Sequence, residues 1–403
     1  KKMNAKSIKG KSTEEIQSSL QEAMSDSFRP TLAIVFLSVK QDREAISKLL
    51  DEKDIQIFGA TTAGEFIDGE IEAGSIVILL LDMNPDYFKI EFVETGREAA
   101  FEDASKLGIT GKETFDKPAF IIATGGVALD GEEIVDGITH GFSTASSSEG
   151  KEVTIFGGKA GDDLALEETY VFTNGKSRNN ALVALIIDED KIDVRGIATC
   201  GWNAIGTTKT VTKSEGNIVY TVDDKPALDV LLNFLGVEIK QDGDKEIVTF
   251  LSSWYYPVQV ERENAGPVIR TAMFANRKDR SLIFSGNVPQ GSKIKFAMPP
   301  DFDSIDKVVA DCKSIKDDAQ QQADALIMFS CVSRHLSFGM VIKEEIEQVQ
   351  NIWNAPMAGF FTYGEYGKSL PVRQAGLPAG QAGETGKNEY HNNACCMVVL
   401  KEL

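Results

Sequence analysis

Short apolar runs alternate with stretches of helical spacing along the first half of the chain. The run over residues 31–37 is apolar throughout, which predicts a strand buried on both faces. Apolar side chains recur at helical spacing over 42–50, and Ser12 with Glu15 predicts a capping box at the start of an earlier helix. The same patterns predict strands at 55–60, 75–81, 87–93, 119–123, 153–156, 169–173, 181–187 and 194–199, and a helix at 131–142. Strands that alternate with crossover helices predict an α/β fold.

From about residue 206 the pattern changes toward shorter strands. It predicts, in order, a β-hairpin at 211–222, a helix at 226–235, strands up to 296 and an acidic helix at about 302–325. The lysine-rich start is interpreted as a soluble leader. We therefore predict three parts, namely an N-terminal leader and helix at 1–29, a first domain at 30–215 and a second domain at 216–403.

A pattern of strand, helix, strand and glycine-rich exit occurs over 32–64 and again over 325–366. The shared residues are Gly59, Thr62, Gly64 and Glu65 in the first copy and Gly359, Thr362, Gly364 and Glu365 in the second. The segment at 153–163 looks like a looser relative. Such repetition predicts two related domains with mixed β-sheets covered by helices. Glycines at strand ends permit close approach of a ligand, so the Gly–Glu bends are predicted to line a pocket. The alternative is that they only form turns.

Composition narrows the classes of function. The 403 residues include 61 acidic and 42 basic side chains, and the net charge of −19 disfavours nucleic acid as a partner. The longest aliphatic run, 76–81, has the length of a strand, so no membrane insertion is predicted. Five cysteines without framework spacing fit a reducing compartment, and we predict a cytoplasmic location. No cofactor or metal site is predicted, because the histidines have no ligand spacing.

Seven segments in order resemble the FIST family of sensory domains, named for F-box and intracellular signal transduction proteins. They are 57–66 (IFGATTAGEF), 156–163 (FGGKAGDD), 201–231, 281–294, 325–339, 359–367 (GFFTYGEYG) and 390–394 (YHNNA). The resemblance covers roughly residues 30–400 and implies N-terminal and C-terminal FIST-type domains that bind a small molecule. Amino acids are among the ligands proposed for the family, for which no general catalytic activity is established. No segment resembles an output domain, so we expect a separate signalling partner.

A ligand site is predicted in the C-terminal half, where the apolar strand ending at Cys331 meets the Gly–Glu bend. In this hypothesis Glu365 binds an ammonium group, Arg334 binds a carboxylate and Tyr363 forms a wall. The resemblance gives CVSR (331–334) a characteristic position and brings the YHNNA segment toward the bend. The predicted site comprises Cys331, Arg334, Tyr363, Gly364, Glu365, His391 and Asn392, with a second candidate site at Gly64, Glu65, Gly158 and Asp162.

Each candidate also has a structural interpretation. Cys331 fits a buried core position, and the asparagines after His391 fit a turn that starts a strand. Arg270, Arg277 and Arg280 could hold an anion or lie paired on the surface. The glycine-rich segment 373–388 is predicted to be a loop that covers the pocket.

Two other functions stay open at this stage. The first is a cysteine-dependent enzyme in which Cys331 acts with His391. The second is a scaffold whose groove binds a peptide or protein.

Overall fold

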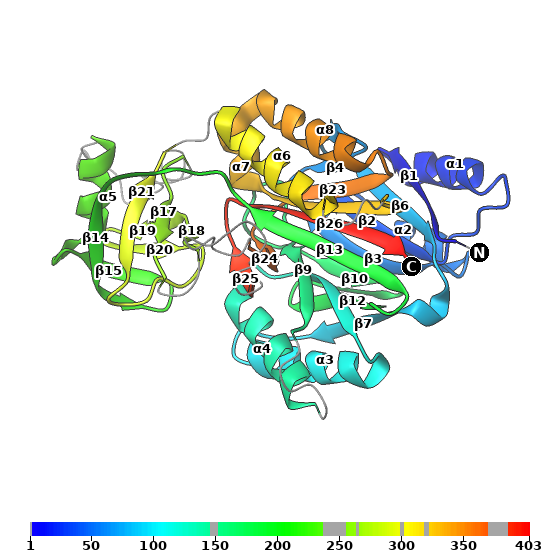
Figure 1. Cartoon of the computed structure of the whole chain (residues 1–403), viewed down its shortest axis with the longest axis horizontal. Coiled ribbons are helices and arrows are strands. Elements are labelled where there is room, and N and C mark those ends of the chain that lie inside the picture. The colour runs from blue at the N-terminus through cyan, green and yellow to red at the C-terminus, as the bar shows by residue number, and fades with distance from the viewer. Residues whose placement is uncertain are drawn as a thin grey trace.

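Three six-stranded sheets form the body of the molecule, and a smaller lobe stands beside it (Figure 1). The computed structural model describes residues 2–145, 152–236, 255–262, 266–298, 302–317, 322–369 and 386–403. Figure 1 shows both termini at the end of the body that lies away from the lobe. The predicted α/β fold class, with mixed sheets covered by helices, is confirmed.

The strands of the three body sheets follow the same pattern of position and direction. The first contains β1 (Asn4–Gly10), β6 (Ile76–Asp82), β2 (Leu32–Ser38), β3 (Gln56–Thr62), β10 (Val171–Thr173) and β11 (Lys176–Arg178). The second contains β7 (Phe88–Glu94), β12 (Ala181–Asp188), β8 (Pro118–Thr124), β9 (Thr154–Lys159), β24 (Glu365–Lys368) and β25 (Asn388–His391). The third contains β13 (Ile192–Thr199), β26 (Cys395–Glu402), β22 (Ala325–Cys331), β23 (Met357–Thr362), β4 (Glu65–Ile67) and β5 (Glu70–Glu72). The third and fourth strands of each sheet are parallel.

Two helices cover the outer face of each sheet, and the second helix of each pair lies in the crossover between the two parallel strands. The pairs are α1 (Thr13–Ala23) with α2 (Arg43–Asp51), α3 (Ala100–Thr114) with α4 (Gly131–Thr144), and α6 (Phe302–Asp317) with α8 (Ile342–Trp353). A shorter helix α7 (Val332–Phe338) follows β22, and two 3-10 turns lie at Pro85–Tyr87 and Gly339–Val341. Ser12 caps α1 by accepting a hydrogen bond from the Glu15 amide at 3.3 Å. The predicted capping box is thereby confirmed.

In each sheet the last two strands form a hairpin that comes from a different part of the chain than the other four strands. The hairpin β4–β5 leaves the first sheet and pairs with β23 of the third. Likewise β24–β25 leaves the third and pairs with β9 of the second, and β10–β11 leaves the second and pairs with β3 of the first. The three sheets are therefore locked together in a cycle. That the sequence repetition reflects duplication of one unit stays a prediction.

The inner faces of the three sheets meet in a common core. Phe36 of β2 contacts Phe360 of β23 with ring centroids 4.6 Å apart, and Phe329 of β22 at 6.0 Å. The second sheet adds Ile121 and Leu185 to the same apolar cluster. Because strands of all three sheets are buried on both faces, they appear in the sequence as continuous apolar runs.

The lobe is inserted between β13 and α6 and has its own apolar core. Its eight-stranded sheet contains β14 (Ala204–Glu215), β15 (Ile218–Val222), β16 (Lys225–Pro226), β17 (Val258–Val260), β18 (Val268–Arg270), β19 (Ala272–Asn276), β20 (Ser281–Phe284) and β21 (Lys293–Ala297). Helix α5 (Ala227–Leu235) packs on it. The predicted hairpin at 211–222 is confirmed by the pairing of β14 with β15. The predicted boundary at residue 215 lies inside this sheet, and the third sheet combines strands from both sides of that boundary.

Two expectations about elements are wrong. Residues 4–10, interpreted as part of a soluble leader, form β1, which pairs with β6 at the edge of the first sheet. Lysines suit this position, because charged side chains protect an edge strand from pairing with another chain. Helix α6 ends at Asp317, and residues 322–324 of the longer predicted helix are not helical.

Candidate functional site

A cavity of about 990 Å³ lies between the lobe and the body. On the body side it is lined where β9 and β22 end, by Lys159 and Cys331, and by the turn between β25 and β26. On the lobe side it is lined by the β14–β15 turn and by residues 283–287 after β20. A crevice outside the carboxyl ends of parallel strands is a common ligand site in α/β proteins.

Lys159 is the only buried lysine in the described part of the chain. It is the last residue of β9, and its Nζ donates hydrogen bonds to the main-chain oxygens of Leu129 at 2.8 Å and Val127 at 3.3 Å. Burial lowers the pKa of Lys159 to about 8, an effect that the charge of Asp130 partly opposes. The Nζ also lies 5.9 Å from the centre of the Tyr390 ring. Lys159 therefore supplies an amine to the cavity that exchanges its proton near neutral pH.

Asn393, a buried residue beside the same cavity, has an unused hydrogen-bond donor. Its side chain is fully buried, and its Oδ1 accepts a hydrogen bond from Thr271 Oγ1 at 2.7 Å. Its Nδ2 has no partner among the described residues, although buried amides are almost always bonded.

The predicted cysteine and histidine do not form a nucleophile–base pair. Cys331 lines the cavity, where its Sγ lies 2.8 Å from Ser333 Oγ, and burial raises the pKa of the thiol far above its usual range. His391 is buried, its Nε2 lies 3.3 Å from Gly367 O, and burial lowers its pKa to about 4. No hydrogen bond joins Cys331 to His391 in the described structure. A neutral thiol and an imidazole held elsewhere do not favour thiolate chemistry.

Arg334 is fully buried and bound entirely to protein groups. Its guanidinium forms an ion pair with Glu345 and donates to Cys200 O at 2.6 Å and Asn393 O at 3.1 Å. The guanidinium also lies 5.2 Å from the Trp202 ring. Arg334 thus holds the main chain of Asn393 in place and is not available to a ligand carboxylate.

Glu65 and Glu365 have matching environments away from the cavity surface. Both are fully buried, and each bonds to the threonine three residues before it, Thr62 or Thr362. Each also accepts a main-chain hydrogen bond, from Ser75 N at 2.9 Å and Ala394 N at 3.1 Å. Burial raises the pKa of Glu65 to about 7 and that of Glu365 to about 8. Neither carboxyl lines the cavity.

Some of the other predicted residues line the cavity, and the rest stabilise the turns and strands around it. Tyr363 and Asn392 line the cavity, and the Tyr363 hydroxyl donates to Asp162 at 2.5 Å. Asp162 itself accepts from the amides of residues 166–168 at 2.7–2.9 Å, so it holds a turn. The glycines pack tightly, because a Cβ on Gly158 would lie 2.6 Å from a methyl group and one on Gly364 2.1 Å from the Tyr390 hydroxyl.

Gly64 adopts a φ of +122° beside Phe361, away from the cavity lining. The predicted lid at 373–388 lies outside the described residues except for 386–388.

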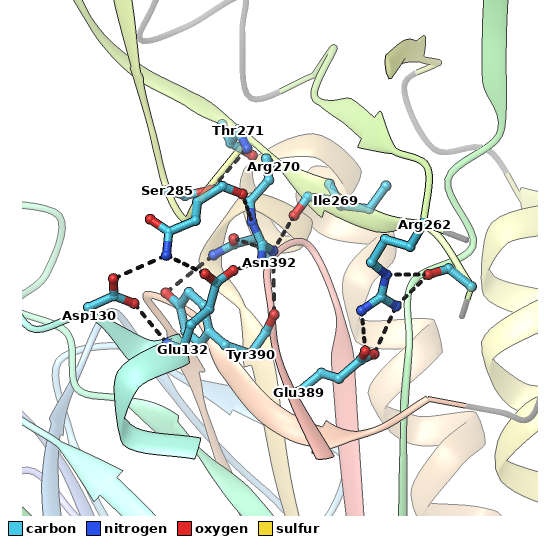
Figure 2. Close-up of polar contacts among 12 residues, drawn as sticks. Asp130, Glu132, Arg262, Ile269, Arg270, Thr271, Ser285, Glu389, Tyr390 and Asn392 are labelled. Atoms are coloured by element: carbon cyan, nitrogen blue, oxygen red, sulfur yellow. Dashed lines mark hydrogen bonds and ion pairs between the residues drawn. The ribbon is translucent and has the colours of Figure 1, made fainter. Parts of the chain in front are cut away.

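Figure 2 shows two arginines that connect the lobe to the body. Arg270, at the end of β18, pairs with Glu132 of α4 and donates to Tyr390 O and Asn392 Oδ1, both at 3.3 Å. Arg262 pairs with Glu389 of β25. Of the other arginines considered as anion ligands, Arg280 pairs with Asp229 within the lobe, and Arg277 does not line the cavity.

Two cavity groups, Lys159 and Asn393, were missed from the sequence. Lys159 lies inside the FGGKAGDD segment (156–163), from which only Gly158 and Asp162 are predicted as site residues. A lysine directly after a buried strand is the signal that could have identified it. Asn393 adjoins the quoted His–Asn pair, but only the structure shows that its amide is unpaired.

Comparison with known proteins identifies the class. The FIST N domain model matches residues 31–225 and the FIST C domain model matches residues 227–368. The chain therefore belongs to the FIST family, whose domains are sensory domains of signal transduction.

Individual relatives add little about function. The chain is 23% identical to an uncharacterized protein of Methanocaldococcus jannaschii, over 92% of this chain and 73% of that protein. A cyanuric acid hydrolase from A. caulinodans aligns over the whole of both chains, with 6% identity and a TM-score of 0.30. The T. maritima PurL complexed with ATP aligns over 71% of its own chain and all of this one, with 11% identity and a TM-score of 0.20. TM-scores this low do not establish a shared fold, and no conclusion about this protein is based on these two structures.

The described residues contain neither a metal-binding cluster nor a helix suited to cross a membrane. No group of three or more histidine, cysteine or acidic side chains there is arranged to hold a metal ion. No described helix has both the length and the apolar character needed to cross a membrane.

Proposed function

We propose that this protein is a cytoplasmic sensor that binds a small polar metabolite in the cavity between lobe and body and signals to a separate protein. The unpartnered Nδ2 of Asn393 carries the proposal, because a buried donor without a partner costs free energy until a ligand satisfies it. A volume of about 990 Å³ is in the range of small-molecule pockets. The free state of all five cysteines supports a reducing compartment.

The charges around the cavity favour a zwitterion such as an amino acid. The buried part offers donors, the third N–H of the Lys159 ammonium form and the amide of Asn393, which suit a carboxylate. Glu98 and Glu133 line the cavity from exposed positions, and Asp130 is half-buried beside them. An ammonium group directed toward these acids would be stabilised while the carboxylate faces inward.

The contacts of the lobe suggest how occupancy could reach a partner. The Arg270–Glu132 pair joins the lobe to the α4 start, and Asn287 of the lobe donates to Asp130 in the same place (Figure 2). A ligand that contacts both sides of the cavity stabilises the arrangement in which those contacts fit it. The partner protein then recognises the position of the lobe, which depends on whether the ligand is bound.

The two other functions have less support. A cysteine-dependent enzyme requires an activated thiol, whereas burial raises the pKa of Cys331 and His391 bonds elsewhere. A peptide-binding scaffold requires an extended groove, whereas the polar groups here converge on a cavity sized for a metabolite.

A thermal-shift screen of amino acids, 2-oxo acids, nucleosides and short peptides tests the proposal. A ligand should raise the melting temperature of the parent protein by mass action, and the rise should be lost in Asn393→Asp. Asn354→Asp is the matched control, because Asn354 has a similar φ of +50° but lies exposed at the end of α8. The proposal fails if no compound stabilises the parent, or if Asn393→Asp responds to the ligand as the control does.

A further inference from the structure

Lys159 differs from an ordinary ion-pairing lysine. It is buried at the cavity, yet no carboxylate lies within ion-pair distance of its Nζ among the described residues. The surface lysines, by contrast, commonly pair with acids, as Lys117 does with Asp190. A buried ammonium without a counterion is costly, so burial makes the neutral amine more populated here than in an exposed lysine.

The hydrogen bonds of Lys159 leave the amine lone pair free. A neutral amine has two N–H groups, and the two main-chain acceptors, Leu129 O at 2.8 Å and Val127 O at 3.3 Å, account for both. The remaining valence is the lone pair, on the side-chain nitrogen of a residue that lines the cavity. With a pKa lowered to about 8, about a tenth of the amine is in this neutral form at pH 7. A neutral, desolvated amine is a nucleophile toward carbonyl carbon.

We propose that Lys159 captures the carbonyl group of a 2-oxo acid as an imine inside the cavity. The lone pair of Nζ forms a bond to the carbonyl carbon, and the C=O electron pair moves to the oxygen. That oxygen takes up a proton as the nitrogen loses one, which gives a carbinolamine. Loss of the hydroxyl with a second proton from the nitrogen releases one water and leaves the C=N bond, so no oxidant or reductant is needed.

Other cavity groups suit the rest of such a ligand. The free Nδ2 of Asn393 is a donor for the carboxylate beside the carbonyl. The Ser333 hydroxyl lines the same cavity and can carry protons between nitrogen and oxygen. The Tyr390 ring, 5.9 Å from Nζ, provides an apolar wall. This inference rests on the proposed function, because it assigns to the same metabolite cavity a second class of ligand, the 2-oxo acids, beside the amino acids.

Reductive trapping tests the inference. The full chain is incubated at pH 7 with glyoxylate and cyanoborohydride, and the adduct is counted by intact mass and located by peptide mapping. With pKa values of about 8 and 10.5, Lys159 has about 300-fold more neutral amine than an ordinary lysine. We expect one lysine adduct per chain, at Lys159; the α-amino group, whose ordinary pKa is also about 8, is counted separately by the peptide map. Lys159→Arg, which keeps a cation but has no nucleophilic amine, should give none, while Lys117→Arg at an exposed position should label as the parent does.

The outcomes separate the two proposals. Adducts spread evenly over exposed lysines, or an equal yield in Lys159→Arg, would overturn the imine. If glyoxylate or another screened compound raises the melting temperature and yet leaves Lys159 unmodified, the imine is wrong and the cavity still binds a metabolite. If no compound of the screen stabilises the protein, the proposed function itself fails.

Discussion

Replacing Glu65 by glutamine should remove a large part of the pH dependence of stability. The Glu65 carboxyl is fully buried, and burial raises its pKa from 4.5 to about 7. Between these values the folded protein keeps a proton that the unfolded chain releases. Stability therefore falls as pH rises from about 4.5 to about 7, and this contribution is constant above that range.

The size of the effect follows from the two pKa values. The difference, 7 − 4.5 = 2.5, corresponds to about 3 kcal/mol at about 1.4 kcal/mol for each pKa unit. Glutamine cannot titrate, so Glu65→Gln should gain about 3 kcal/mol relative to the parent between pH 4.5 and pH 8. Glu365, whose pKa is also raised, is present in both proteins and contributes equally to each.

Urea unfolding at a series of pH values measures this difference directly. Glu44→Gln, on the exposed side of α2, is the matched control, and its curve should stay parallel to that of the parent. Infrared difference spectra should show a protonated carboxyl band at pH 5.5 that weakens in Glu65→Gln. A constant free-energy difference between Glu65→Gln and the parent across this pH range would refute the reasoning.

Two further substitutions test packing at the site. Gly364→Ala places a Cβ 2.1 Å from the Tyr390 hydroxyl at a φ of +152°, and should lower the free energy of unfolding by about 3 kcal/mol. Gly74→Ala, also at positive φ but with open space, should cost only about 1 kcal/mol, so equal losses in urea unfolding would contradict the steric account. Arg270→Met removes the buried partner of an ion pair with the partly exposed Glu132 and should cost about 2–3 kcal/mol by the same measurement. Lys117→Met, at an exposed pair, should cause no measurable loss, and a similar loss in both variants would show that burial of the Arg270 pair is unimportant.

The apolar runs predicted most of the strands because strands buried on both faces leave a continuous signal. Helix α3 was missed for a physical reason. Its Gly108 and Gly111 resemble helix breakers in the sequence, but a Cβ on Gly108 would lie 2.2 Å from Ile138 O of α4, and one on Gly111 2.1 Å from Phe120. These glycines allow close packing of helix and sheet, which local propensity does not report.

The exchange of hairpins among the sheets could not be predicted from local pattern. β4 is three residues long, and its partner β23 lies almost 300 positions away in the chain. Such pairings depend on how all three sheets close around their common core, which is information that the spacing of apolar residues within one segment does not contain.

The sequence predicted three residues of the cavity lining but not the partners of the charged residues. Cys331, Tyr363 and Asn392 line the cavity, because each follows or ends a buried strand. Arg334, expected to bind a ligand, is instead paired with Glu345, which lies eleven residues further along the chain. A charged residue in a sequence shows no partner, and only packing decides whether another protein group or a ligand neutralises it.

The most direct test of the central claim is a crystal structure of the protein with the compound that stabilises it most in the thermal-shift screen. We predict that the compound occupies the cavity between lobe and body, with one oxygen within hydrogen-bond distance of Asn393 Nδ2 and another group on Lys159 Nζ. A compound bound elsewhere, with ordered water alone in the cavity, would contradict the account.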